Sequence, residues 1–514
     1  MARYKEYDYR QGKFIPVSFD KQILPGTFEY TLNYLIDNEL DLSVFDARHT
    51  NDDTGAPAYD PAILLKIILY AYSRGITSSR TIEQCCKENI IFMALSCDTR
   101  PHFTTIADFV STLGREIITL FLEVLLVCDH MHLIGKELFA IDGVKLSSNA
   151  SKEWSGTKED LTHKKEKMER IIRQMMARHK ETDAKEQNKD ATEREAQYVA
   201  TLRENVKKIR TWLKEHDDKP GKKKPIKSNI TDNESATMKT SHGVVQGYDG
   251  VAVVDTKHQI IVHAEAFGAP QEQELLQPML QGTRQNLEEI GSPSVFDHAK
   301  LTADSGFHSE KNMQLLMEDG IDAFIADPQF RKRDPRFAAQ DRFKERTRKE
   351  YADAHGTTTA FTIRQFRMSD DTTHCICPAG KRLHRNGGNV VVKKYRGIKF
   401  RGNKTDCRIC ALRTKCLRYP DRTDVRQVYF FQGRAPYLPE SCTEKMKRKI
   451  DSLIGRLIYN QRLATVEPVF ANICSTLRLN RFTLRGKRKV NIQWLLYCIA
   501  HNLLKVHRYG YGYA

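Results

Sequence analysis

Three acidic residues that lie far apart in the chain each stand where a metal-binding carboxylate is expected. Asp142 directly follows the apolar run 138–141, Asp304 ends the run 300–303, and Glu467 lies in a helical stretch. Three converging carboxylates can hold two divalent ions, Mg²⁺ or Mn²⁺, and two such ions can drive in-line displacement at a phosphate. The three residues therefore indicate an enzyme that cuts and joins DNA strands.

The surroundings of the two aspartates favour this interpretation but leave an alternative open. Asp304 stands at the carboxyl end of a predicted strand that leads into a helix, where open sheets place their active groups. The pair Ser305-Gly306 after it predicts a tight turn with room for a phosphate backbone. Asp142 precedes Gly143, and an Asp-Gly pair is also ordinary turn chemistry.

Other acidic residues compete for the same roles. Asp255 precedes a predicted hairpin turn, Asp327 precedes a proline and looks like a strand stop, and Glu265 is a weaker alternative to Glu467. Pro468 follows Glu467 directly, and a proline disfavours helical geometry in the residue before it. We therefore expect the helix to kink at Pro468 or to begin again there, with Glu467 near a positive helix end.

The composition limits the class of protein. The 514 residues are too many for one ordinary core, so about two to four folded units are expected. Hydrophobic residues make up 40% of the chain, which is enough for packed cores and argues against a disordered protein. The net charge of +17 favours a polyanionic partner, either nucleic acid or an anionic membrane surface.

A membrane location is not supported by the sequence. The longest apolar run, residues 117–128, contains a glutamate and is too short to span a bilayer. The amino-terminal residues lack the apolar stretch of a secretory signal, so the sequence predicts a cytoplasmic protein. The 12 cysteines are then not a disulfide framework, and most are expected to be buried core thiols. Examples are Cys85, Cys86, Cys128 and Cys498.

Residues 1–130 are predicted to be mostly helical. Asp60-Pro61 opens an apolar run and is a helix start signal, and Gly75 ends that run. Ser78-Ser79 and Thr104-Thr105 open two further helices. Short helices with tight joints are typical of a helix-turn-helix-like DNA-binding domain. A plain helical cap on the catalytic core is the alternative.

Residues 158–218 interrupt the predicted core, which spans 131–326, with a charged stretch that lacks Pro and Gly. Apolar residues recur in it at spacings of three and four, which predicts a coiled-coil seam and an inserted helical hairpin. These residues are Leu161, Met168, Ile172, Met175, Val199, Leu202, Val206, Ile209 and Leu213. The polar segment 180–188 would turn the chain, and 219–227 follow as a basic linker. The hairpin would be a dimer contact, an arm over DNA, or a solvated surface element.

Strands and helices alternate in the rest of the core as a mixed α/β sheet requires. The predicted strands are 137–147, 243–255, 259–265, 300–304 and 321–326, and the predicted helices are 271–290 and 309–318. We expect the first three strands to form a meander and the last two to run parallel. Residues 441–514 return to helix, and 490–505 should pack on the core.

Clustered cysteines and basic residues mark a predicted insertion over 327–440. Two short-spaced cysteine groups resemble the knuckles of a zinc ribbon. The four expected zinc ligands are Cys377, Cys407, Cys410 and Cys416, with Cys375 as the spare. Reduced, unliganded thiols are the alternative. Basic residues nearby favour contacts with DNA phosphates; they are Arg382, Lys393, Lys394, Arg396, Lys399 and Arg401.

In these motifs and their order, the chain resembles the DDE transposases of bacterial insertion sequences, specifically the group named for insertion sequence 1182. The resemblance extends nearly from end to end. It rests on residues 55–66, 75–83, 140–143, 231–239, 304–307, 466–470 and 501–505.

The resemblance implies an RNase H-like catalytic core in which Asp142, Asp304 and Glu467 are the metal ligands. It also implies binding to the terminal inverted repeats of a mobile element, by a homodimer, in the bacterial cytoplasm with the nucleoid. Tyr459 and Arg462 match a Tyr-Arg-Glu signature whose residues contact DNA near the cleavage site.

Two departures from that signature stand out. Four residues, rather than three, separate Arg462 from Glu467, and Cys474 stands near the place of an expected lysine. Arg478 and Arg481 are the candidates to supply the missing charge. Two further hypotheses stand beside a transposase: a catalytically inactive DNA-binding protein derived from one, and an RNase H-like nuclease that cuts without joining.

Overall fold

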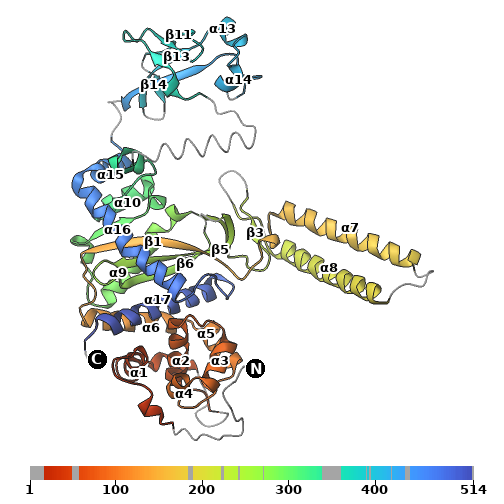
Figure 1. Cartoon of the computed structure of the whole chain (residues 1–514), viewed down its shortest axis with the longest axis vertical. Coiled ribbons are helices and arrows are strands. Elements are labelled where there is room, and N and C mark those ends of the chain that lie inside the picture. Colours follow the sequence, from red (N-terminus) through yellow and green to blue (C-terminus); the bar gives the residue numbers. More distant parts are fainter. Residues whose placement is uncertain are drawn as a thin grey trace, which may run out of the picture. The chain divides into compact units, whose positions relative to one another are not determined.

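The chain divides into two compact units in the computed structural model (Figure 1). Unit 1 comprises Met1–Ala326 and Ser452–Ala514, and unit 2 comprises Asp327–Asp451. The structure describes residues 17–48, 57–182, 189–220, 225–240, 243–269, 271–337, 361–388, 390–392, 395–417, 419–434 and 440–511. The predicted turn at 180–188, part of the linker 219–227, Lys393 and Lys394 therefore lie wholly or partly outside the described residues.

The amino-terminal part of unit 1 is helical, as predicted. Its helices are α1 (Phe28–Asn38), α2 (Pro61–Ser73), α3 (Ser79–Glu88), α4 (Ile90–Leu95), α5 (Phe103–Thr112) and α6 (Glu116–His130). The Asp60 carboxylate accepts a hydrogen bond from the backbone N–H of Ala62 at 2.7 Å and caps α2, which starts with Pro61. Helix α5 begins at Phe103 with His102 as its cap, one residue before the predicted start.

A six-stranded mixed sheet forms the centre of unit 1. Its strands are β1 (Leu138–Ser147), β4 (Ala236–Thr240), β5 (Gly243–Asp255), β6 (Ile261–Phe267), β7 (Lys300–Ala303) and β8 (Asp322–Ile325). Their order is β4-β5-β1-β7-β8, and β6 also pairs with β5. Strands β1, β5 and β6 form an antiparallel meander, whereas β7 and β8 run parallel to β1. The predicted RNase H-like mixed sheet is confirmed.

Two carboxyl-terminal helices complete the core of unit 1. Helix α16 (Leu453–Ala471) contacts β1, β5, β7 and β8, and α17 (Lys487–Tyr509) contacts β6, α2 and α6. The side-chain amide of Asn502 pairs with the backbone N–H and C=O of Ile261, both at 2.9 Å. The indole of Trp494 donates to the carbonyl of Val251 at 3.1 Å. As predicted, the closing segment packs on the core.

Helix α16 runs without interruption through Pro468, and a π turn over Asn472–Thr476 follows it. The prediction that a break separates Arg462 from Glu467 is therefore wrong, and Glu467 lies near the carboxyl end of the helix. Packing of α16 on four strands outweighs the local preference of a residue that precedes proline.

The inserted hairpin forms as predicted. Figure 1 shows α7 (Lys158–Thr182) and α8 (Lys189–Glu215) side by side. The predicted seam is buried between them in two clusters, one around Ile172 and Val206 and the other around Leu161, Ile209 and Trp212. Strands β2 (Ser155–Gly156) and β3 (Ser228–Asn229) pair at its base. The predicted helix 271–290 is present as α9 (Leu276–Glu289), and Ser309 caps α10 (Glu310–Glu318).

Unit 2 contains a second six-stranded sheet. Its strands are β9 (Arg367–Met368), β10 (His374–Ile376), β11 (Arg382–Arg385), β12 (Val390–Val392), β13 (Tyr395–Arg401) and β14 (Gln427–Arg434). Its short helices are α11 (Phe330–Arg333), α13 (Lys404–Arg408), α14 (Arg413–Cys416) and α15 (Cys442–Asp451). Among the predicted core thiols, Cys86, Cys128 and Cys498 are buried, whereas Cys85 is half-buried.

No helix among the described residues is both long enough and apolar enough to cross a membrane.

A buried histidine is expected to make unit 1 sensitive to acid. His501 lies between the side-chain amide of Asn472 at 2.9 Å and the carbonyl of Gln259 at 3.0 Å. Burial lowers the pKa of His501 to about 4, so the folded protein holds the neutral ring. The neutral ring contributes about 3 kcal/mol to the free energy of unfolding above the ordinary pKa of about 6.5. This contribution is lost as the pH falls towards 4.

Chemical unfolding between pH 7.5 and pH 4.5 tests this expectation. His501→Gln should flatten the loss of unfolding free energy on acidification, because glutamine has no proton to gain in this range. The control is His163→Gln, which removes an exposed histidine of α7 and should leave the pH dependence unchanged. Equal slopes for wild type and His501→Gln would contradict the assignment.

Candidate active site

The parallel pairing of β1 with β7 brings two of the predicted carboxylates together. The last register pair of the two strands is Ile141 with Ala303, so Asp142 and Asp304 are the next residues on neighbouring strands. Their side chains are 25% and 40% exposed, which leaves both within reach of a ligand.

A guanidinium from α16 lies between the two aspartates. Arg462 places Nη1 2.5 Å from Oδ2 of Asp142 and Nη2 3.3 Å from Oδ1 of Asp304. Its side chain is only 8% exposed, and its Cζ lies 5.8 Å from the centre of the Tyr459 ring. The two signature residues are thus beside the candidate active site, and Arg462 partly offsets the negative charge that the aspartates bring together.

The protonation of Asp142 depends on its neighbours. Burial raises the pKa of Asp142 to about 6, although Arg462 and the N–H of Gly143 oppose that rise. The negative charge of Asp304 adds to the rise. A cation beside Asp142 therefore favours the ionised carboxylate that a metal ligand requires.

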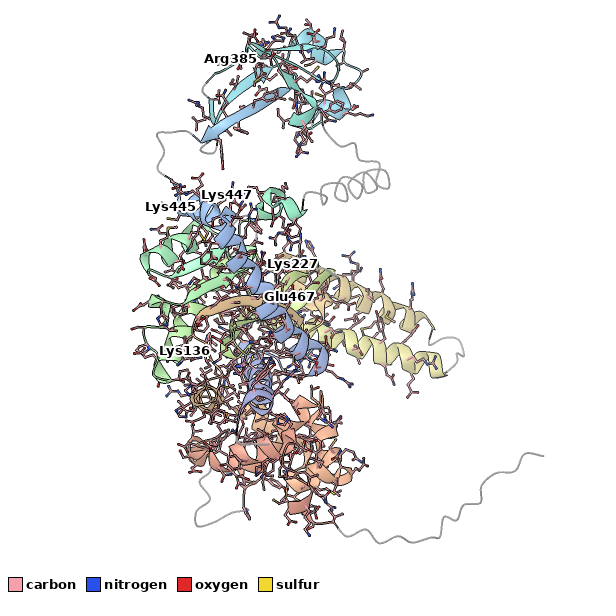
Figure 2. All side chains as sticks on the ribbon, turned by 60° about the vertical axis from the view of Figure 1, so that its left-hand side comes forward. Lys136, Lys227, Arg385, Lys445, Lys447 and Glu467 are labelled. Atoms are coloured by element: carbon pink, nitrogen blue, oxygen red, sulfur yellow. The ribbon has the colours of Figure 1, made fainter. Side chains whose placement is uncertain are left out.

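Glu467 does not join the two aspartates in this structure. Figure 2 labels it on α16, whose buried face includes Arg462, Thr465, Val466 and Val469. Glu467 is exposed, and at 100° per residue it lies about 140° round the helix from Arg462. Among the described residues, no group of three or more His, Cys, Asp or Glu side chains is arranged to hold a metal ion. The role of Glu467 as the third ligand stays a prediction.

A buried carboxylate that the sequence did not single out lies beside Asp142. Asp249 of β5 is 1% exposed, and neither of its oxygens has a hydrogen-bond partner. Burial raises its pKa to about 7, with Lys145 opposing the rise and Glu272 and Asp142 adding to it. A β-carbon added to Gly143 would come within 2.6 Å of Oδ1 of Asp249.

This contact explains the Asp142-Gly143 pair. Both residues lie inside β1, opposite Ala252 and Val251 of β5, so the alternative that the pair forms a turn is wrong. Glycine is required at 143 because the Asp249 carboxylate occupies the space of a side chain. A weak sequence signal for Asp249 exists, since a second Asp-Gly pair stands at 249–250 inside a predicted strand.

A second ion pair lies near these acids. Lys145 of β1 is paired with Glu272, and the Glu272 carboxylate lies where a β-carbon of Gly306 would be. Gly306 belongs to the predicted tight turn after Asp304. The space that a side chain at 306 would take is occupied by the Glu272 carboxylate of the same chain. Lys145 also interacts with Asp249 and Asp304.

The competing acids have structural partners. Asp255 accepts backbone N–H groups of Gly135, Lys136 and Lys257 at 2.9 Å each, as suits a residue that fixes a hairpin. The partners of the other two are Arg333 for Asp327 and Lys487 for Glu265.

The candidates for the missing lysine lie on the surface. Arg478 is exposed at a positive φ of 59°, and its side chain packs against Gly75. Arg481 donates to the side chain of Asn149 at 3.0 Å and, with Arg485, lines an open groove of about 740 Å³ next to residues 147–151. Cys474 is half-buried, and burial raises its pKa to about 11, so it supplies no charge.

The four predicted zinc ligands line one cavity in unit 2. Cys377, Cys407, Cys410 and Cys416 surround a volume of about 30 Å³, the size of a single water or ion. Burial raises the pKa of Cys416; Arg426 lowers it, and the other three cysteines each raise it. The four cysteines line this cavity, but among the described residues no group of three or more His, Cys, Asp or Glu side chains is arranged to hold a metal ion.

The spare thiol has a different role. Cys375 is fully buried and belongs to the apolar cluster that also contains Leu383, Ile398, Phe400 and Val428. It is a core residue of the sheet.

Two family models match the chain. One is described as a transposase DDE domain and matches residues 376–507, and the other, a transposase domain (DUF772), matches residues 17–112. Both matches support an insertion-sequence DDE transposase. The first match contains Arg462 and Glu467 but neither Asp142 nor Asp304. These two aspartates are brought together by the parallel pairing of β1 with β7. No curated protein matches the transposase. Transposases of this family generally use divalent metal ions.

The contact between Gly143 and Asp249 yields a stability prediction. Gly143→Ala should lower the unfolding free energy by about 1–3 kcal/mol, because the added methyl group would force a buried carboxylate to shift. The measurement is urea unfolding of the full chain.

The control is the same substitution in an Asp249→Ala background. There the added methyl group meets empty space, so the penalty of Gly143→Ala should largely disappear. An equal penalty in both backgrounds would show that the carboxylate is not what requires glycine at 143.

Proposed function

We propose that this transposase binds the inverted-repeat ends of an insertion sequence and then cleaves and joins DNA strands there. The observation that carries the proposal is the pair Asp142 and Asp304, set side by side by parallel strands and bridged by one buried arginine. Two oxygen ligands on adjacent strands fit a divalent cation that prefers oxygen.

In this proposal Asp142, Asp304 and Glu467 hold two Mg²⁺ or Mn²⁺ ions. The ions would activate the attacking oxygen and stabilise the leaving oxygen of an in-line displacement. The residues of the chain position the DNA around them: Arg462 and Tyr459 beside the aspartates, and Arg478 and Arg481 on the nearby surface. Double-stranded DNA, as element ends and as target, is the partner, and paired ends favour a homodimer.

A second candidate function has an observation in its favour. Because Glu467 faces away from Asp142 and Asp304, a transposase-derived DNA-binding protein without catalysis fits the same fold. A nuclease that cuts without joining is the third possibility. Strand-cleavage and strand-transfer assays on end-sequence DNA separate the three. The proposal also includes membership of the insertion sequence 1182 group and association with the nucleoid.

The carboxylates are tested by substitution. Asp142→Ala, Asp304→Ala and Glu467→Ala should each abolish Mg²⁺-dependent cleavage of element-end duplexes, because each removes a proposed ligand. Binding to the same duplexes, measured by gel shift, should persist.

The matched control is Glu265→Ala, which removes a carboxylate of the same sheet that pairs with Lys487 at 2.8 Å. Its cleavage rate should stay close to that of the wild type. Full activity of Glu467→Ala would remove Glu467 from the ligand set, and full activity of the triple variant would overturn the proposal.

We also propose that Cys377, Cys407, Cys410 and Cys416 bind a structural zinc ion. The support is their convergence on one small cavity and the fit of four thiolates to tetrahedral zinc. Elemental analysis of the purified full chain should find about one zinc per chain. Cys407→Ser and Cys410→Ser should lose it, whereas Cys375→Ser should retain it because Cys375 lies in the apolar core. A wild-type protein without zinc would contradict the site.

A further inference from the structure

The positive charge of the chain is concentrated in one module. Residues 361–434 contain 18 lysines and arginines but only 5 acidic residues, a surplus of 13 out of the +17 of the whole chain. A polyanion is therefore the partner that this module is suited to attract. Charge alone, however, does not say what part of a nucleic acid the module contacts.

The two faces of its sheet differ in chemistry. One face is apolar and buried, and its cluster includes Leu383, Ile398, Phe400 and Val428. Side chains alternate along a strand, so Lys399 between Ile398 and Phe400 belongs to the opposite face. The second face is the outer face of the sheet, and β14 pairs with β13 at the edge of the sheet.

Three aromatic rings lie together on this outer face. Tyr429 and Phe431 of β14 are stacked, with ring centres 6.3 Å apart and planes 12° apart. Tyr395 of β13 meets Phe431 edge-on at 6.1 Å. Phe431 is 54% exposed and Tyr395 is 42% exposed, although folding usually covers rings of this size.

Cations border these rings. The Nζ of Lys399 lies 5.7 Å from the centre of the Tyr429 ring, and Lys399 pairs with Tyr429 in the strand register. Arg401 follows two residues later on the same face, opposite His384 of β11. The face therefore offers exposed rings beside positive charges.

A purely structural role explains only part of this arrangement. Phe431 pairs with Gly397 across the strands, and a β-carbon on Gly397 would meet the Phe431 ring at 3.1 Å. The ring thus covers a glycine, which stabilises many sheets. Covering Gly397 does not account for the exposed Tyr395 or for the stacked Tyr429 beside a lysine.

We propose that the outer face of this sheet binds unpaired DNA bases, which stack on Tyr395, Tyr429 and Phe431 while Lys399 and Arg401 contact the phosphates. Flat aromatic faces among cations bind single strands because every base has an aromatic face, whereas a duplex keeps those faces inside its stack. The inference rests on the proposed function only in taking DNA as the partner. It adds that the transposase holds a strand whose bases are unpaired.

Binding of the full chain to two labelled single strands tests the proposal. One is a thymidine oligonucleotide and the other is an abasic strand of the same length, which keeps the phosphates and lacks the bases. The wild type should bind the thymidine strand more tightly. Phe431→Leu and Tyr429→Leu should each weaken that binding by about 5- to 150-fold and leave the abasic strand unaffected.

The matched control is Tyr419→Leu, which removes a ring that is 56% exposed in the loop between α14 and β14. It should bind both strands as the wild type does. Lys399→Gln should weaken both strands alike and reduce the salt dependence, because it removes a phosphate contact. Thermal melting of each variant confirms that the sheet is intact.

Several results would overturn the inference. They are equal binding of the wild type to both strands, equal loss on both strands in Phe431→Leu, and a duplex that competes as well as the thymidine strand. An acidic protein surface as the true occupant would appear as equal binding to both strands. Cleavage of element-end duplexes is measured separately, so a wild type that cleaves without preferring the thymidine strand sinks this inference alone.

Discussion

Two negative charges held side by side by parallel strands are the constraint on which the rest of unit 1 depends. The register of β1 and β7 places Asp142 and Asp304 next to each other. Partial burial raises the free-energy cost of the repulsion between their charges. The cation that offsets it, Arg462, comes from a helix more than 150 residues further along the chain. Removing one partner of such a group would leave an uncompensated buried charge, which is strongly destabilising. The packing of α16 on the sheet and the geometry of the site therefore depend on each other, because Arg462 belongs to both.

The same region carries more negative charge than Arg462 neutralises. Besides the two aspartates it contains Asp249 and Glu272, and Lys145 is the other nearby cation. A site with such a surplus of carboxylates attracts cations, but it repels a DNA backbone. Attraction of DNA must come from elsewhere in the chain. The module 361–434, with its surplus of 13 positive charges, and the groove lined by Arg481 and Arg485 are the parts suited to that task. Charge is thus divided between basic parts suited to a polyanion and an acidic region suited to cations.

The sequence predicted what depends on local pattern. Short apolar runs located β1 and β7, and with them Asp142 and Asp304; three- and four-residue spacing located the seam of the hairpin. What it missed depends on long-range register. The meander predicted from the sequence pairs β5 with β1, but Asp249 lies beside Gly143 because of the register of that pair, which no local signal specifies. The cysteines are an intermediate case, since spacing selected all four of them, but only the folded unit shows that they line one cavity.

Glu467 shows how one residue of spacing changes a side chain's direction. With three residues after Arg462, a glutamate would stand at 466, about 40° round the helix from the arginine and on its buried face. That position is Val466, which is fully buried, and the fourth intervening residue turns Glu467 about 140° away. The extra residue in the signature therefore accounts for the outward direction of Glu467. Only a wider turn between them, with hydrogen bonds from i to i+5 as in the π turn at Asn472–Thr476, would align both side chains on one face.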